Sequence, residues 1–271
     1  MSRETVDIVE NHVLDRVRKT PKRPLVFGIC GAQGSGKTTL VTALANQLEQ
    51  VGLRTFSLSL DDIYLPRAER AELAREIHPL LGVRGVPGTH DVAIGTAILD
   101  RLGGHEPVDV PAFDKAADDR ALRTNWTRAV GPFDVILFEG WCIGAIAQHP
   151  DELRIPINRL ESSDDPAAIW RTYVNASLGQ GYQALFARID SLVLLQAPGF
   201  EIVVQWRNEQ EETLRQSLLK SGRPIDRLMD TAAITRFVSH FERLTRHILS
   251  EMPSRADLVV PLDPHRRPLI V

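Results

Sequence analysis

Apolar residues along the chain form two kinds of pattern. Short continuous apolar runs at residues 24–30, 134–140 and 190–195 are typical of strands that are buried on both faces. Polar and apolar residues alternate over 54–60, which predicts a strand with one face less buried. A late run at 258–262 predicts a further strand, and the proline within it favours a place at the sheet edge.

Segments with helical spacing lie between these runs. Valines recur at helical spacing over residues 4–19, and a proline follows at position 21, so we expect a helix that ends before it. The same reasoning predicts further helices over 38–48, 68–77, 92–102, 200–220 and 230–250.

Strands that alternate with helices predict an α/β protein, in which a parallel sheet carries helices on both faces. In such sheets, ligands bind outside the carboxyl ends of the strands. The stretch 61–132 lies between two strands and is too long for a simple crossover. We interpret it as a substrate-binding insertion within a single domain that spans residues 1–271.

Composition narrows the class of protein. With 43% hydrophobic and 25% charged residues, the chain is typical of a soluble globular protein. A net charge of −3 argues against a nucleic-acid partner, whose binding surfaces are usually strongly basic. No apolar run is long enough for a membrane span, and the N-terminus lacks the apolar core of a signal peptide. Cys30 and Cys142 form no paired motif, so we expect a cytoplasmic protein; no pattern indicates an oligomeric state.

Residues 31–38 carry the motif G-x-x-x-x-G-K-T between a predicted strand and a predicted helix. This is the context of a P-loop, whose backbone N–H groups hold phosphates at the N-terminus of a helix. Lys37 is placed to reach the β- and γ-phosphates, and the Thr38 hydroxyl is a ligand for Mg²⁺. We therefore predict that ATP, with Mg²⁺, binds to Gly31, Ala32, Gln33, Gly34, Ser35, Gly36, Lys37, Thr38 and Thr39.

Three acidic residues lie at the carboxyl ends of strands that should end beside this loop. Asp61 and Asp62 follow the strand after the P-loop helix, where a carboxylate can orient a substrate hydroxyl and accept its proton. Adjacent residues of a strand point to opposite faces, so we expect only one of the two to face the cleft; Asp61 is the candidate and Asp62 its rival. Glu139 closes an apolar strand in the position of an acid that supports the metal.

A loop rich in Gly and Pro, residues 82–91, ends in His90 and Asp91. Asp91 is a suitable N-cap for the helix predicted over 92–102. A single histidine in such a loop can be a structural hydrogen-bonding residue or a catalytic one, and the sequence favours neither.

Taken together, these segments resemble the phosphoribulokinase, uridine kinase and pantothenate kinase superfamily of P-loop kinases. Within it, the chain is most similar to the plant and fungal type of D-glycerate 3-kinase. The resemblance covers about residues 24–215 and rests on 31–38, on 59–64 (S-L-D-D-I-Y), on 84–91 (R-G-V-P-G-T-H-D) and on 138–144 (F-E-G-W-C-I-G).

By position, the resemblance implies that Asp61 is the catalytic base and that Glu139 lies near Mg²⁺. It implies that Arg207, in a lid-like helical segment at about 200–220, brings its charge to the phosphates. It also implies an acceptor site in the insertion, where basic residues can bind a carboxylate. The residues assigned to this acceptor site are Asp62, Tyr64, Arg84, His90, Asp91, Lys115 and Arg120.

The resulting hypothesis is ATP-dependent phosphorylation of a small hydroxylated metabolite, with D-glycerate giving 3-phosphoglycerate as the favoured reaction. Two alternatives stay open. One is a kinase for another small metabolite, as in the uridine and pantothenate kinases. The other is a P-loop ATPase that hydrolyses ATP slowly in order to change its conformation.

Overall fold

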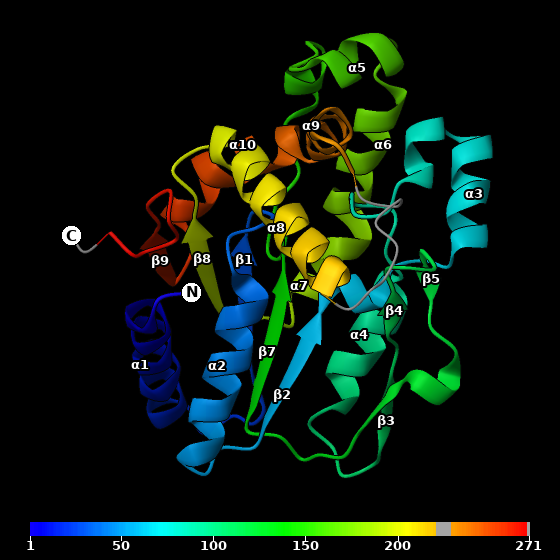
Figure 1. Cartoon of the computed structure of the whole chain (residues 1–271). Helices are drawn as coiled ribbons and strands as arrows, with labels where there is room; N and C mark the ends of the chain where they lie inside the picture. Colours follow the sequence, from blue (N-terminus) through cyan, green and yellow to red (C-terminus); the bar gives the residue numbers. More distant parts are fainter. Residues whose placement is uncertain (221–228, 270–271) are drawn as a thin grey trace.

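The computed structural model describes residues 1–220 and 229–269. Its central strands are β1 (Leu25–Gly31), β2 (Thr55–Ser59), β7 (Val135–Gly140), β8 (Ser191–Gln196) and β9 (Leu258–Pro261). They form a parallel sheet in the order β2-β7-β1-β8-β9 (Figure 1). The predicted α/β fold with a parallel sheet is confirmed, and β9 lies at its edge, as the proline in that strand predicts.

Helices cover both faces of the sheet, because successive side chains of each strand point to opposite faces. In β1, Phe27 and Ile29 join one apolar cluster, whereas Val26 and Cys30 join the other. The first cluster is completed by α1 (Arg3–Lys19), α2 (Lys37–Gln50), α8 (Glu201–Lys220) and α9 (Thr231–Ser239). The second is completed by α4 (Val92–Arg101), α5 (Arg159–Asp164), α6 (Ile169–Ser177), α7 (Gln183–Phe186) and α10 (Glu242–Glu251).

The chain between β2 and β7 builds a layer of short elements beside α4 (Figure 1). It contains the helix α3 (Arg67–Glu76), the antiparallel pair β3 (Val108–Val110) and β6 (Thr127–Ala129), and a small hairpin of β4 (Phe113–Asp114) and β5 (Asp119–Arg120). Short 3₁₀ turns in the chain are η1 (Leu60–Ile63), η2 (Pro79–Gly82), η3 (Arg123–Asn125), η4 (Pro150–Leu153) and η6 (Met252–Ser254), and a π-helical turn η5 (Leu178–Tyr182) joins α6 to α7. The acceptor-binding role of residues 61–132 stays a prediction.

One predicted helix is wrong. The helix expected over 230–250 is two helices, α9 and α10, which meet at His240 and Phe241. The break has a packing reason: α9 contributes Ile234 and Val238 to one core cluster, and α10 contributes Leu244 to the other.

Among the described residues, no helix combines the length and the apolar composition that crossing a membrane requires.

Candidate active site

The loop between β1 and α2 has the shape of a phosphate-binding cradle. Gly34 and Gly36 have φ of 78° and 91°, in the left-handed region that glycine adopts without strain. Among the described residues, no side chain caps the N-terminus of α2, so its first backbone N–H groups can bind an anion. Lys37 Nζ donates to the carbonyl of Ala32 at 3.1 Å, and within the described residues the buried Ser35 hydroxyl has no hydrogen-bond partner. This loop fits the phosphates of a nucleotide.

Residues far along the chain hold this loop in place. A Cβ at Gly34 would come within 2.6 Å of Trp206 Cβ, so the loop packs directly on α8. Arg266 Nε donates to the Gly34 carbonyl at 2.6 Å, while its guanidinium lies over the Trp206 ring at 5.1 Å. An ion pair of 2.7 Å links Arg266 to Glu209. Sequence reasoning missed Arg266, because nothing near residue 266 marks it as a neighbour of the P-loop.

Glu139 lies beside the P-loop because β7 pairs with both β1 and β2. Ser59 is opposite Glu139 in the β2–β7 register. Its hydroxyl donates to Glu139 Oε1 at 3.1 Å, and the Thr38 hydroxyl donates to the same oxygen at 3.2 Å. Two hydroxyls and a carboxylate form an oxygen-rich set of the kind that Mg²⁺ prefers, alongside water and phosphate oxygens. The described residues contain no cluster of three or more His, Cys, Asp or Glu that could hold a metal without such help.

Asp61 is held by two partners at the end of β2. The Tyr64 hydroxyl donates to Asp61 Oδ1 and Lys115 Nζ donates to Oδ2, both at 2.7 Å. Burial alone would raise the pKa of Asp61, but the Lys115 ammonium and these two hydrogen bonds outweigh it and hold the pKa below its usual value. Asp61 is therefore a carboxylate at neutral pH, with each oxygen engaged.

Asp62 feels the negative charges of both Asp61 and Glu139. Burial, followed by the charges of Asp61 and Glu139, raises the pKa of Asp62 to about 6. The expectation that only one of the two aspartates would face the cleft was based on strand alternation. Both lie in the 3₁₀ turn η1, where that alternation does not apply, and Lys115 acts on both carboxyls.

The loop that precedes α4 places His90 beside the same cluster. Tyr64 and His90 form an isolated β-bridge, and their rings stack with centroids 4.6 Å apart. His90 Nδ1 lies 2.5 Å from the hydroxyl of Tyr182, which also accepts a hydrogen bond from the Gly88 N–H at 3.0 Å. Burial lowers the pKa of His90 to about 3, so the ring is neutral. Tyr182 comes from η5, and no motif in the sequence marks it as a neighbour of His90.

Arg120 and Asp91 tie the hairpin to the start of α4. Asp91 Oδ1 accepts from the Ile94 N–H at 3.0 Å, which confirms the predicted N-cap. Its other oxygen accepts from Arg120 at 3.1 Å, and Arg120 also donates to the Tyr64 carbonyl at 3.0 Å. These bonds hold the backbone of the site together, while the binding of an acceptor by either residue stays a prediction.

Arg84 is paired with Asp118 at the hairpin tip, where its guanidinium lies 5.4 Å from the centre of the Phe113 ring. A second arginine, Arg70, pairs with the same aspartate at 3.1 Å. The two arginines anchor the hairpin that carries Lys115, whose side chain is 61% exposed. Of the three basic residues predicted in the acceptor site, Lys115 alone contacts Asp61 in the described structure.

Arg207 lies one residue after Trp206 on α8, but its side chain does not join this cluster. Its guanidinium pairs with Glu211 at 2.8 Å and lies 5.8 Å from the centre of the Phe237 ring on α9. The role of Arg207 at the phosphates, and of its helix as a lid, stays a prediction.

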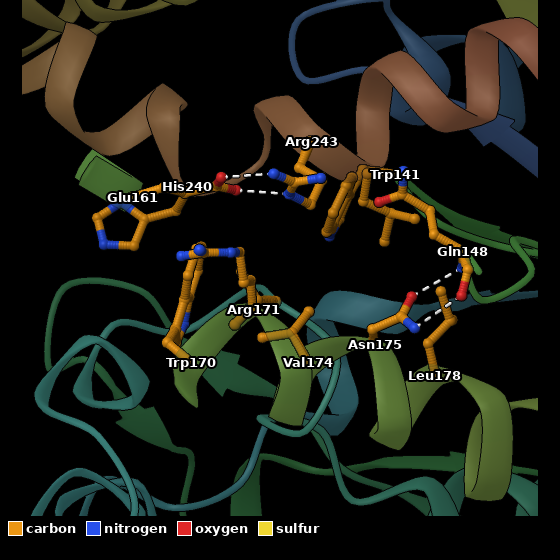
Figure 2. A pocket seen from close by; sticks show the side chains of 12 residues that line it. Trp141, Gln148, Glu161, Trp170, Arg171, Val174, Asn175, Leu178, His240 and Arg243 are labelled. Atoms are coloured by element: carbon orange, nitrogen blue, oxygen red, sulfur yellow. Dashed lines mark hydrogen bonds and ion pairs between the residues drawn. The ribbon is translucent and has the colours of Figure 1, made fainter. Parts of the chain in front are cut away.

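A separate small cavity is lined by Val86 of the loop 84–91 and by residues of α6 and α10. Figure 2 shows Trp170 and Arg171 of α6 facing His240 and an ion pair of Glu161 with Arg243, whose Nε–Oε1 distance is 2.7 Å. The cavity measures about 20 Å³, room for about one water molecule. It is too small for a nucleotide or a metabolite and does not belong to the site above.

The proteins that this chain resembles are kinases, in agreement with the phosphate-binding loop described above. No model of a protein family matches the chain. The uncharacterized kinase mug58 of Schizosaccharomyces pombe is 31% identical over 285 residues, which cover 98% of this chain and 99% of that protein. The chloroplastic D-glycerate 3-kinase of Arabidopsis thaliana is 30% identical over 261 residues, 91% of this chain. The match spans about half of the plant protein, 54% of its length.

Solved structures support the fold. A D-glycerate 3-kinase from Cryptococcus neoformans var. grubii matches with a TM-score of 0.80 at 23% identity, over 99% of both chains. A possible uridine kinase from Bacillus stearothermophilus matches with a TM-score of 0.53 at 17% identity, over 95% of this chain and 97% of that one. The fold of these proteins is the fold of this chain.

Proposed function

The chain belongs to the family of P-loop kinases that includes D-glycerate 3-kinase, and from this premise we propose that it transfers the γ-phosphate of ATP to D-glycerate, giving 3-phosphoglycerate and ADP. The observation that carries the proposal is the cluster of Asp61, Tyr64 and Lys115 at the carboxyl end of β2. It combines an ionised acid with a cation, the two groups that an acceptor with a hydroxyl and a carboxylate requires.

Asp61 acts on the acceptor hydroxyl. As the primary hydroxyl oxygen of glycerate bonds to the γ-phosphorus, the bond from phosphorus to the β,γ-bridging oxygen breaks and ADP leaves. The hydroxyl proton passes to a carboxylate oxygen of Asp61, which Tyr64 holds in place from the other side. Lys37 supplies positive charge to the phosphates, and backbone N–H groups at the start of α2 orient them.

Lys115 changes partner in this scheme. Its ammonium bonds Asp61 Oδ2 at 2.7 Å, and its exposed side chain sits on the hairpin tip, where it can swing to a carboxylate that enters beside Asp61. Transfer of Lys115 to the acceptor carboxylate frees one oxygen of the base. An acceptor without a negative charge leaves Lys115 on Asp61, so the exchange favours anionic acceptors over nucleosides.

Thr38 and Glu139, with Ser59 behind them, would hold Mg²⁺ next to the phosphates. When bound there, the ion neutralises charge on the β- and γ-phosphates. The hydroxyls of Thr38 and Ser59 keep the Glu139 carboxylate turned toward the P-loop. We propose the cytoplasm as the compartment, which is consistent with two buried, unpaired cysteines.

The test is an acceptor panel with the purified chain, ATP and Mg²⁺. D-glycerate, L-glycerate, glycerol, uridine and pantothenate are compared by ADP release, and the product is identified by ³¹P NMR. We expect D-glycerate to give 3-phosphoglycerate at the highest kcat/KM. Turnover with uridine or pantothenate alone would support the alternative kinases, and phosphate release to water alone would support a P-loop ATPase.

The dependence on the proposed base is tested with a matched pair of variants. Asp61→Asn should lower the rate of transfer to D-glycerate by about 10²- to 10⁴-fold. Asp15→Asn serves as control, since Asp15 also pairs with a lysine at 2.7 Å but lies on the surface of α1. Equal loss in both variants would mean that the effect is not specific to the site.

A further inference from the structure

The His90 ring is fixed on three sides. It stacks on Tyr64, meets the Tyr182 ring edge-on at 5.6 Å, and brings Nδ1 to 2.5 Å from the Tyr182 hydroxyl. Only 4% of the residue is exposed. Its second nitrogen, Nε2, is buried and has no hydrogen-bond partner among the residues that the structure describes.

Hydrogen-bond counting fixes the tautomer of this ring. The Tyr182 oxygen already accepts from the Gly88 N–H, so its own proton needs an acceptor, and Nδ1 is the acceptor within reach. If Nδ1 is bare, the sole unmet group is the N–H at Nε2. If Nδ1 carries the proton, both the buried Tyr182 O–H and the Nε2 lone pair are unmet. Each buried polar group without a partner is costly, so the first arrangement is favoured.

The ring is therefore a neutral donor beside the reacting groups. Burial keeps it uncharged, and the charge of the nearby Asp61 acts on it. Tyr64 links the two residues physically, since its ring stacks on His90 and its hydroxyl bonds Asp61. The Nε2–H group of His90 is a buried donor that needs a hydrogen-bond acceptor. The hydroxyl and carboxylate oxygens of glycerate can supply one.

We propose that His90 Nε2–H donates a hydrogen bond to an oxygen of the acceptor, and that Tyr182 is a positioning residue that holds His90 in the tautomer able to do so. This deepens the proposed function, on which it rests, by assigning one donor of the acceptor site. It also gives Tyr182, 92 residues away from His90 along the chain, a role in acceptor recognition.

The tautomer is tested directly on the wild-type chain. With ¹⁵N-labelled histidine, long-range ¹H–¹⁵N spectra distinguish the protonated ring nitrogen from the bare one, and His90→Gln assigns the resonance. We expect Nε2 to carry the proton and its signal to shift when D-glycerate is added at saturation. A proton on Nδ1 would overturn the proposal. A proton on Nε2 whose signal ignores saturating D-glycerate would also overturn it, and would indicate a bond to water.

Kinetics test the same donor independently. His90→Gln keeps an N–H near the position of Nε2 and should retain the KM for D-glycerate within about fivefold, whereas His90→Phe should raise it about 10- to 100-fold. Tyr182→Phe should raise the KM for D-glycerate about fivefold or more and leave the KM for ATP nearly unchanged. Equal KM values for Gln and Phe at position 90 would contradict the donor role.

Tyr173→Phe is the matched control for Tyr182, because within the described residues the Tyr173 hydroxyl has no hydrogen-bond partner. In Tyr182→Phe the histidine spectrum should show a mixture of tautomers, which a merely structural loss would not produce. Failure of the proposed function is seen in a different measurement. In that case the wild-type chain does not turn over D-glycerate, whichever tautomer the histidine spectrum shows.

Discussion

Replacement of Lys115 by methionine tests the exchange of this lysine between base and acceptor. Methionine keeps much of the length of the side chain and removes its charge. Lys115 Nζ lies 2.7 Å from Asp61 Oδ2, and its side chain is 61% exposed. Two unit charges at this distance attract by about 1.5 kcal/mol in water and by about 6 kcal/mol at an effective dielectric constant of 20. The exposure places this pair near the lower figure.

An interaction of about 1.5 to 2 kcal/mol corresponds to a factor of about 10 to 30. The carboxylate of D-glycerate would lose the same partner in Lys115→Met, so its KM should rise by about 10- to 30-fold. The KM for ATP should change less than about threefold, because the P-loop does not involve Lys115. Lys19→Met is the matched control, since Lys19 makes the same 2.7 Å contact with an aspartate on α1.

Two further readouts follow from the state of Asp61. In the wild type Lys115 lowers the pKa of Asp61, so its loss must raise that pKa, and the acid limb of kcat/KM should move to higher pH. One oxygen of the base is also left without a partner, so ATP hydrolysis without acceptor should rise relative to transfer. A Lys115→Met enzyme with unchanged KM for D-glycerate and an unchanged acid limb would refute the exchange.

Four other predictions concern the P-loop lysine and the acidic residues of the site. Lys37→Ala should nearly abolish transfer while the fold is kept, as circular dichroism can show; near wild-type turnover would contradict the nucleotide assignment. Asp61→Asn should lower kcat by about 10²- to 10⁴-fold with little change in ATP binding, and Asp62→Asn should be milder; the reverse order would make Asp62 the base. Glu139→Gln should raise the Mg²⁺ concentration needed for half-maximal rate, and an identical titration would count against its role. Burial raises the pKa of Asp62 to about 6, so the native state binds more protons than the unfolded state between about pH 4 and 6. The contribution of Asp62 to stability should therefore fall as pH rises through this window, by up to about 3 kcal/mol, so in urea unfolding with EDTA the free energy of unfolding of the wild type should fall relative to that of the Asp62→Asn variant.

The sequence by itself determined the local features of the protein. The motif at 31–38 identifies the phosphate loop, because strand, glycines, lysine and helix are contiguous in the chain. Apolar runs and helical spacing located the strands of the central sheet, and Asp91 was recognised as an N-cap. Such features can be predicted because their causes, periodicity and turn chemistry, act over a few residues.

Only the tertiary structure decided which distant side chains meet. The strand order sets Ser59 opposite Glu139, the hairpin brings Lys115 to Asp61, and the π-helical turn delivers Tyr182 to His90. The sequence could not distinguish Lys115 from Arg84 as the cation at the base. Both are basic residues of the same insertion, and the choice depends on which acid each one reaches after folding. That pairing is set by packing between distant segments, which produces no periodic pattern in the sequence.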